Sequence, residues 1–185
     1  MGSEMCIRDR LNDLFGIQSR AGCSCAGPYG HRLLAIDEAT SEKYRVAVRE
    51  GHCGLKPGWC RVGLHWVMDD AEANYVIEAV HFLAREGHQF LALYDFDLAS
   101  GTCAHKHGSV ALQKFSLDAA LAARQGEPAT LSLPLRQQLY RHYMSEAQRI
   151  ADRLRNGPEA KLRSLEGELG DLQFFAMPDD ERPPH

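Results

Sequence analysis

A ten-residue run of small residues and turn formers, residues 21–30 (AGCSCAGPYG), limits what the first third of this chain can become. Such a run interrupts helices and strands alike. A backbone this rich in glycine either turns tightly or comes close to a ligand. Residues 11–15 before it are typical of the last turn of a helix, and Gly16 is expected to end that helix in a left-handed conformation. The loop is therefore the first candidate for chemistry.

The periodicity of the following residues predicts alternating helices and strands up to residue 97. The segments are helices over 31–36 and 40–50 and strands over 60–67 and 89–96. Between the two strands, Asp69 and Glu72 have the spacing of a capping box, which predicts a helix that ends at Gly87. This order favours the α+β class, with helices packed on a short antiparallel sheet.

A second region begins at residue 98 and is expected to be an extension with more helix. It is predicted to contain a hairpin around Gly101 and Gly108, a short helix near 116–124, one long helix over 134–155 and a last strand at 174–175. Apolar residues form a single stripe along the long helix, and an Asn-Gly-Pro sequence ends it. The expected organisation is a domain over 11–97 followed by an extension over 98–185.

Composition narrows the range of partners. The net charge is -4 and the basic residues are scattered, whereas nucleic-acid partners favour a clustered basic face. No apolar run approaches the length of about 18 residues that spans a bilayer. The six cysteines follow no secretory signal and form no CxxC pair, so reduced thiols in a cytoplasmic protein are expected.

The first ten residues (MGSEMCIRDR) look like the translation of a sequencing-library adaptor. They have neither a signal-peptide pattern nor an amphipathic period. On this interpretation the biological chain starts near Leu11, residues 1–10 are excluded from the fold, and Cys6 has no chemical role.

The segment from Arg20 to Pro28 (RAGCSCAGP) resembles the Arg-x-Gly-x-x-Cys-Ala-x-Pro loop of one branch of cysteine desulfurases and selenocysteine lyases, within the class V aminotransferase family. The flanking residues 11–17 and 28–34 also resemble that family. Residues 59–62 (WCRV) are similar to its strand that carries a carboxylate-binding arginine. The resemblance covers residues 11–97. It implies the small C-terminal domain of a fold-type-I pyridoxal-phosphate enzyme, whose parent is a homodimer that acts on an amino acid.

The resemblance assigns roles to three residues. Cys25 matches the catalytic nucleophile, whose thiolate attacks the sulfur of a cysteine–cofactor adduct. Arg61 matches the residue that binds the substrate α-carboxylate at two points, which a planar guanidinium does well. Arg20 would bind substrate beside it and lower the pKa of the neighbouring thiol. Where the desulfurase branch has histidines, this chain has Cys23 and Ser24, so transamination, epimerisation and elimination stay open as reactions.

The cofactor lysine of this family lies well upstream of the cysteine loop, and only about a dozen residues precede the loop here. Lys106 follows a histidine but stands downstream of the loop, so we expect a solvated lysine there. Cys103, His105 and His107 alternate along one predicted strand, yet no carboxylate accompanies them, and zinc is not favoured. The chain alone is thus expected to bind no pyridoxal phosphate and to be inactive.

A second hypothesis is a non-enzymatic interaction module that binds a partner through the helix over 134–155. A complete module would begin with a capped first helix. Residues 11–16 have the character of a helix end only, which favours the enzyme fragment.

Overall fold

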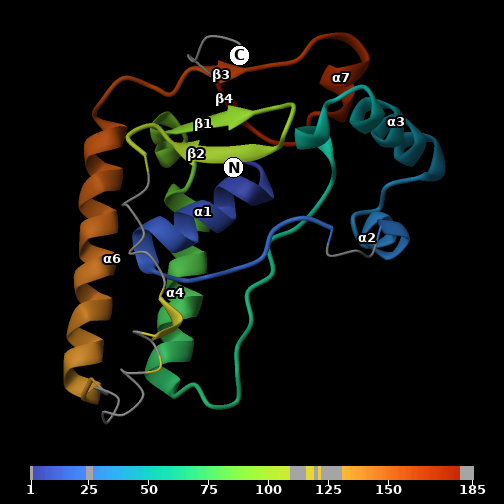
Figure 1. Cartoon of the computed structure of the whole chain (residues 1–185). Coiled ribbons are helices and arrows are strands. Elements are labelled where there is room, and N and C mark those ends of the chain that lie inside the picture. The colour runs from blue at the N-terminus through green and yellow to red at the C-terminus, as the bar shows by residue number, and fades with distance from the viewer. Residues whose placement is uncertain (1, 24–26, 109–115, 119–120, 122–130, 180–185) are drawn as a thin grey trace.

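The computed structural model describes residues 2–23, 27–108, 116–118, 121 and 131–179 (Figure 1). The helical elements are α1 (Glu4–Phe15), α2 (Gly27–Leu33), α3 (Glu38–Arg49), η1 (Cys53–Leu55), α4 (Asp70–Glu86), η2 (Gln89–Leu93), α6 (Leu133–Arg155) and α7 (Gly167–Leu172). The strands are β1 (Tyr94–Asp97), β2 (Thr102–His105), β3 (Leu162–Arg163) and β4 (Met177–Pro178). The short helix expected near 116–124 and the tail after residue 179 fall mostly outside the described residues.

The core lies where α1, α4, α6 and the β1–β2 hairpin meet (Figure 1). Aromatic side chains hold the helices together. Phe15 at the end of α1 packs edge-on against Phe82 of α4, with ring centroids 5.5 Å apart. Tyr75 of α4 stacks on Tyr140 of α6 at 4.2 Å. Such ring pairs add to the stabilisation from the apolar area that they bury.

The sheets are small and antiparallel. β1 pairs with β2 from Tyr94 opposite His105 to Asp97 opposite Thr102, and β3 pairs with β4. The expected hairpin is confirmed, and its turn needs Gly101, whose φ of 73° is left-handed. The α+β class is therefore correct at the level of mixed helices and antiparallel strands.

The predicted helix ends are also confirmed. The side chain of Asp69 accepts from the backbone N–H of Glu72 at 2.9 Å, and the side chain of Glu72 accepts from the N–H of Asp69 at 3.3 Å. Gly16 ends α1 with a φ of 65°, and its N–H donates to Asn12. The long helix α6 starts one residue before the predicted Pro134. Each of these ends is encoded within four residues of sequence, which is why it could be predicted.

The predicted strands are correct only in part: residues 94–96 of the strand expected over 89–96 lie in β1, and the other predicted strand positions differ. Residues 60–67 run as an irregular segment whose one β-bridge joins Arg61 to Arg20. Residues 89–93 form the 3-10 helix η2, and the last strand lies at 177–178 rather than 174–175. An alternating segment forms a strand only if another strand can hydrogen-bond to it. Residues 60–67 have one such partner, Arg20, at a single position. In η2, burial of Phe90 and Leu91 takes the place of strand pairing.

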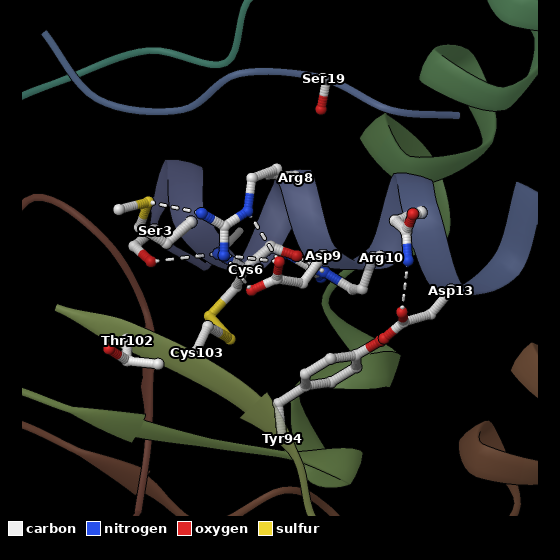
Figure 2. A network of polar contacts seen from close by, with 12 residues as sticks. Ser3, Cys6, Arg8, Asp9, Arg10, Asp13, Ser19, Tyr94, Thr102 and Cys103 are labelled. Atoms are coloured by element: carbon white, nitrogen blue, oxygen red, sulfur yellow. Dashed lines mark hydrogen bonds and ion pairs between the residues drawn. A yellow bond between two sulfur atoms is a disulfide. The ribbon is translucent and has the colours of Figure 1, made fainter. Parts of the chain in front are cut away.

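Residues 2–10 belong to the fold instead of standing apart from it. Ser3 caps α1 by accepting from the N–H of Cys6 at 3.4 Å. Cys6 is fully buried and is disulfide-bonded to Cys103 of β2 (Figure 2). The expectation that all six cysteines are reduced, and that Cys6 has no role, is therefore wrong in this structure. The two cysteines are 97 residues apart, a pairing that no local pattern announces.

A polar network runs through the core beside this disulfide (Figure 2). The Arg10 guanidinium is fully buried and donates to the carbonyl oxygens of Cys6, at 2.8 Å, and of Gly87. Its burial lowers the pKa of Arg10 to about 10, because the charged form is desolvated. The hydroxyl of Tyr94 donates to Asp13 at 2.7 Å, across the α1–β1 contact. Neither group was identified from the sequence.

Candidate functional site

The two arginines that the resemblance singles out lie opposite each other. The N–H of Arg61 donates to the carbonyl of Arg20 at 2.7 Å, and the N–H of Arg20 donates back at 3.2 Å. This reciprocal pair is an antiparallel bridge. In such a pair the Cα atoms are about 5.5 Å apart and both side chains project from the same face. Two residues 41 positions apart in sequence are thus paired through their backbones, with side chains that leave the same face.

Glycines let the two backbones approach beside this bridge. The N–H of Trp59 donates to the carbonyl of Gly22 at 3.3 Å, which extends the contact. A Cβ atom on Gly58 would lie 2.8 Å from the Cα of Gly22, so a larger residue there would push the segments apart. Gly22 itself has a φ of 103°, which favours glycine. These glycines therefore allow two segments of the chain to approach each other closely, whereas the approach to a ligand that the sequence suggested stays a prediction.

The electrostatics of this pair favour an anion. Arg20 and Arg61 are both exposed, and no described residue forms an ion pair with either. Like charges directly opposite each other on a sheet are unfavourable. A bound carboxylate would relieve that repulsion and accept hydrogen bonds from both guanidinium groups. The arrangement is chemically suited to holding a small carboxylate at the surface.

The proposed nucleophile cannot be placed beside the arginines. Cys25 lies at residues 24–26, outside the described part of the chain. Two other thiols near the bridge are free. Cys23 is half-buried, and the Cys60 thiol donates to the Ser19 hydroxyl at 3.3 Å. The structure therefore brings together Arg20 and Arg61 of the three predicted site residues.

A cavity of about 410 Å³ lies next to the segment that carries Arg61 and is mostly apolar. It is lined by Ile7 of α1, Leu83 of α4 and Phe175, with Cys60 and the Glu4 carboxyl as its polar groups. Burial raises the pKa of Glu4. The cavity is lined by residues 58–60 and 62, on either side of Arg61, which is itself exposed.

The described residues do not fit a covalently bound pyridoxal phosphate. Lys43, Lys56, Lys106 and Lys161 are all exposed, whereas the cofactor lysine must face an enclosed site. Lys106 follows strand β2 at the end of the hairpin, and its side chain is exposed, as expected for a solvated lysine. None of these four described lysines is therefore placed to form a Schiff base with the cofactor.

The zinc hypothesis for β2 is also unsupported. Cys103 is committed to the disulfide with Cys6. Over the described ranges, no group of three His, Cys, Asp or Glu side chains is arranged to hold a metal ion. His105 instead packs edge-on against the ring of Tyr94, with centroids 5.2 Å apart.

Comparison with known protein families, with curated proteins and with solved structures finds no match to this chain. Within the part that the structure describes, no helix has both the length and the apolar character needed to cross a membrane. The resemblance to class V aminotransferases therefore stays a prediction from the sequence motifs.

Proposed function

We propose that this chain is the C-terminal part of a pyridoxal-phosphate-dependent enzyme of the class V aminotransferase type, similar to cysteine desulfurases, in which Arg61 and Arg20 bind the α-carboxylate of an amino-acid substrate. The Arg20–Arg61 bridge carries the proposal. Each arginine was singled out by a different motif, and the two motifs meet in space. Cys25 would supply the nucleophile from the same loop, and the cofactor would be held by residues outside this chain.

Exposed apolar side chains next to the arginines support a larger active site. Leu64 is 59%, Trp66 88% and Val67 63% exposed, all within six residues of Arg61. Several large apolar side chains this exposed within one short segment are typical of an interaction site. In the proposed enzyme, these side chains would pack against the part that binds the cofactor. The enzyme would be a homodimer and would act in the cytoplasm.

The alternative, an interaction module that uses α6, is less favoured. The helix is already engaged by its own chain, because Arg136 pairs with Glu72 of α4 at 3.1 Å and Arg155 pairs with Glu86 at 2.6 Å. Ala147 and Ala151 on its apolar stripe are fully buried. Leu133, Leu135 and Tyr143, in the first three turns, are the large apolar residues of α6 that stay exposed.

Carboxylate binding by this chain tests the site directly. Titration of the 185-residue chain with L-alanine should shift the NMR signals of the Arg61 and Arg20 guanidinium groups, and L-alaninamide, which lacks the carboxylate, should not. Arg61→Lys keeps the charge but loses the planar fork, so it should weaken binding several-fold. Equal shifts with both ligands would contradict the carboxylate role.

The enzyme assignment has its own test. The gene sequence upstream of Leu11 should encode a domain with a histidine–lysine pair, and the longer protein should show the visible absorbance of a lysine–cofactor aldimine. An upstream region without such a lysine would contradict the proposed enzyme activity. The carboxylate site of this chain would still be tested separately by the titration with L-alanine.

A further inference from the structure

A separate groove of about 630 Å³ lies between α2, α3 and the segment after α3. Its volume is within the range of about 300–1,000 Å³ that is common for small-molecule sites. Its lining includes the apolar and aromatic side chains of Ile36, Tyr44 and Val48, here called the floor, together with Pro28 and Pro57. None of these residues belongs to the Arg20–Arg61 pair.

The groove has a fixed shape. Tyr44 is 7% exposed, and its hydroxyl donates to the carbonyl of Leu172 at 3.0 Å, which anchors the floor to α7. The ring of Tyr44 packs edge-on against His31 and Phe174. His31 Nδ1 lies 2.7 Å from the Ser41 hydroxyl, so α2 and α3 are tied together across the groove. A ligand would meet a surface that is already formed.

Cationic side chains line the groove without partners. Arg32, Arg49 and Lys56 are exposed lining residues, and no described residue forms an ion pair with any of them. This is notable on a chain whose net charge is -4. Three unpaired cationic side chains therefore line the same groove as the apolar floor.

The other charged residues of the groove are already engaged or lie at a helix start. Arg45 pairs with Glu42 on α3. Asp37 accepts from the N–H of Thr40 at 2.7 Å as the N-cap of α3, and this bond lowers its pKa. Glu38 follows in the first turn, where the helix dipole stabilises a negative charge. These carboxylates therefore have local roles that leave the three cations uncompensated.

We propose that this groove binds an amphipathic organic anion, a carboxylate with a medium-length apolar chain. The chain would lie on the floor of Ile36, Tyr44 and Val48, and the carboxylate would meet Arg32, Arg49 or Lys56 at the rim. Burial of the chain supplies affinity, and the guanidinium groups select the anion over a cation or a neutral alcohol. The proposal stands independently of the enzyme assignment, because it uses no residue of that site.

Calorimetric titration of the 185-residue chain with octanoate tests the site. Octanoate should bind saturably at one site per chain, octanol about tenfold more weakly, and octyltrimethylammonium not at all. Methyl-labelled Ile36 and Val48 should show the largest NMR shifts. Arg49→Glu should weaken octanoate binding by about tenfold or more. The matched control Arg141→Glu makes the same charge change on exposed α6 and should leave binding unchanged.

Three results would overturn the proposal. Equal affinities for octanol and octanoate would show apolar binding without selection for the anion. Arg49→Glu and Arg141→Glu weakening binding equally would show a general charge effect. Methyl shifts confined to other residues would place the ligand elsewhere. If circular dichroism shows that Arg49→Glu is unfolded, Lys56→Glu, which lies outside the helices, provides the same test.

Discussion

Tyr94 is the buried residue whose polar contact is easiest to isolate. It is 2% exposed, and its hydroxyl joins β1 to Asp13 of α1. Tyr94→Phe removes that hydroxyl and keeps the ring, so the free energy of unfolding should fall by about 1 kcal/mol, as for a typical buried hydrogen bond. Urea unfolding measures this. Tyr29→Phe, at a residue that is 64% exposed, should change nothing.

Alkaline pH gives the same residue a second signature. Burial, and then the bond to Asp13, raise the pKa of Tyr94 above its usual value of 10.0. The unfolded tyrosine therefore loses its proton at a lower pH than the folded one, and stability decreases as the pH rises above about 10. Tyr94→Phe should show a shallower decrease than the wild type between pH 10 and 11. Parallel curves for the two proteins would contradict the assigned coupling.

Sequence predicts single residues well when their partners are close in the chain. Gly16 and Asp69 have their partners within four residues and were identified correctly. Arg10 was not, since its acceptor Gly87 is 77 residues away. Arg20 and Arg61 were found through motif resemblance rather than through periodicity, and no local signal indicated that they form a bridge.

At the scale of elements, the start of α4 should depend on Asp69 more than on any neighbour. Asp69→Ala removes the cap and the ion pair with Arg136. We expect a melting temperature lower on the order of a few degrees. Asp70→Ala, in the same first turn but outside the capping box, should have a smaller effect. Equal losses for both variants would show that only the charge near the helix end matters.

The capping role of Asp69 also predicts how the stabilisation by this residue of α4 changes at acid pH. The backbone bond from Glu72, followed by the contact with Arg136, lowers the pKa of Asp69 from 3.8. A carboxyl with a lowered folded pKa stabilises the fold above its unfolded pKa and loses that contribution as the pH falls below it. The gap in melting temperature between wild type and Asp69→Ala should therefore narrow below about pH 4. A gap that stays constant down to pH 2 would exclude this linkage.

Elements whose pattern is local were predicted, and elements that need a partner were not. α4 and α6 repeat apolar residues over several turns and carry their own caps. Residues 60–67 alternate correctly for a strand, but Leu64 and Trp66 face solvent with no strand beside them. In the proposed enzyme, the cofactor-binding part would supply the surface that covers Trp66.

The whole molecule is closed by the Cys6–Cys103 disulfide, which joins the first helix to the hairpin across 97 residues. A cross-link this long removes much conformational freedom from the unfolded chain. It also bears on location, because cytoplasmic glutathione keeps most thiols reduced. If the protein acts in the cytoplasm, as proposed, its disulfide would be reduced there. The reduced chain would then have to be stable enough to stay folded.

Reduction should therefore separate the two forms of the molecule. Adding dithiothreitol should lower the free energy of unfolding by about 2–4 kcal/mol, the usual contribution of a disulfide. Cys103→Ser should show the lower stability without reductant and no further loss with it. Cys53→Ser, which changes an exposed free thiol, should respond to reductant as the wild type does. Thiol titration of the denatured, unreduced chain should detect at most four of the six cysteines. Six reactive thiols would show that the bond does not form, and α1 would then be held to the hairpin by packing and by noncovalent contacts such as Tyr94–Asp13.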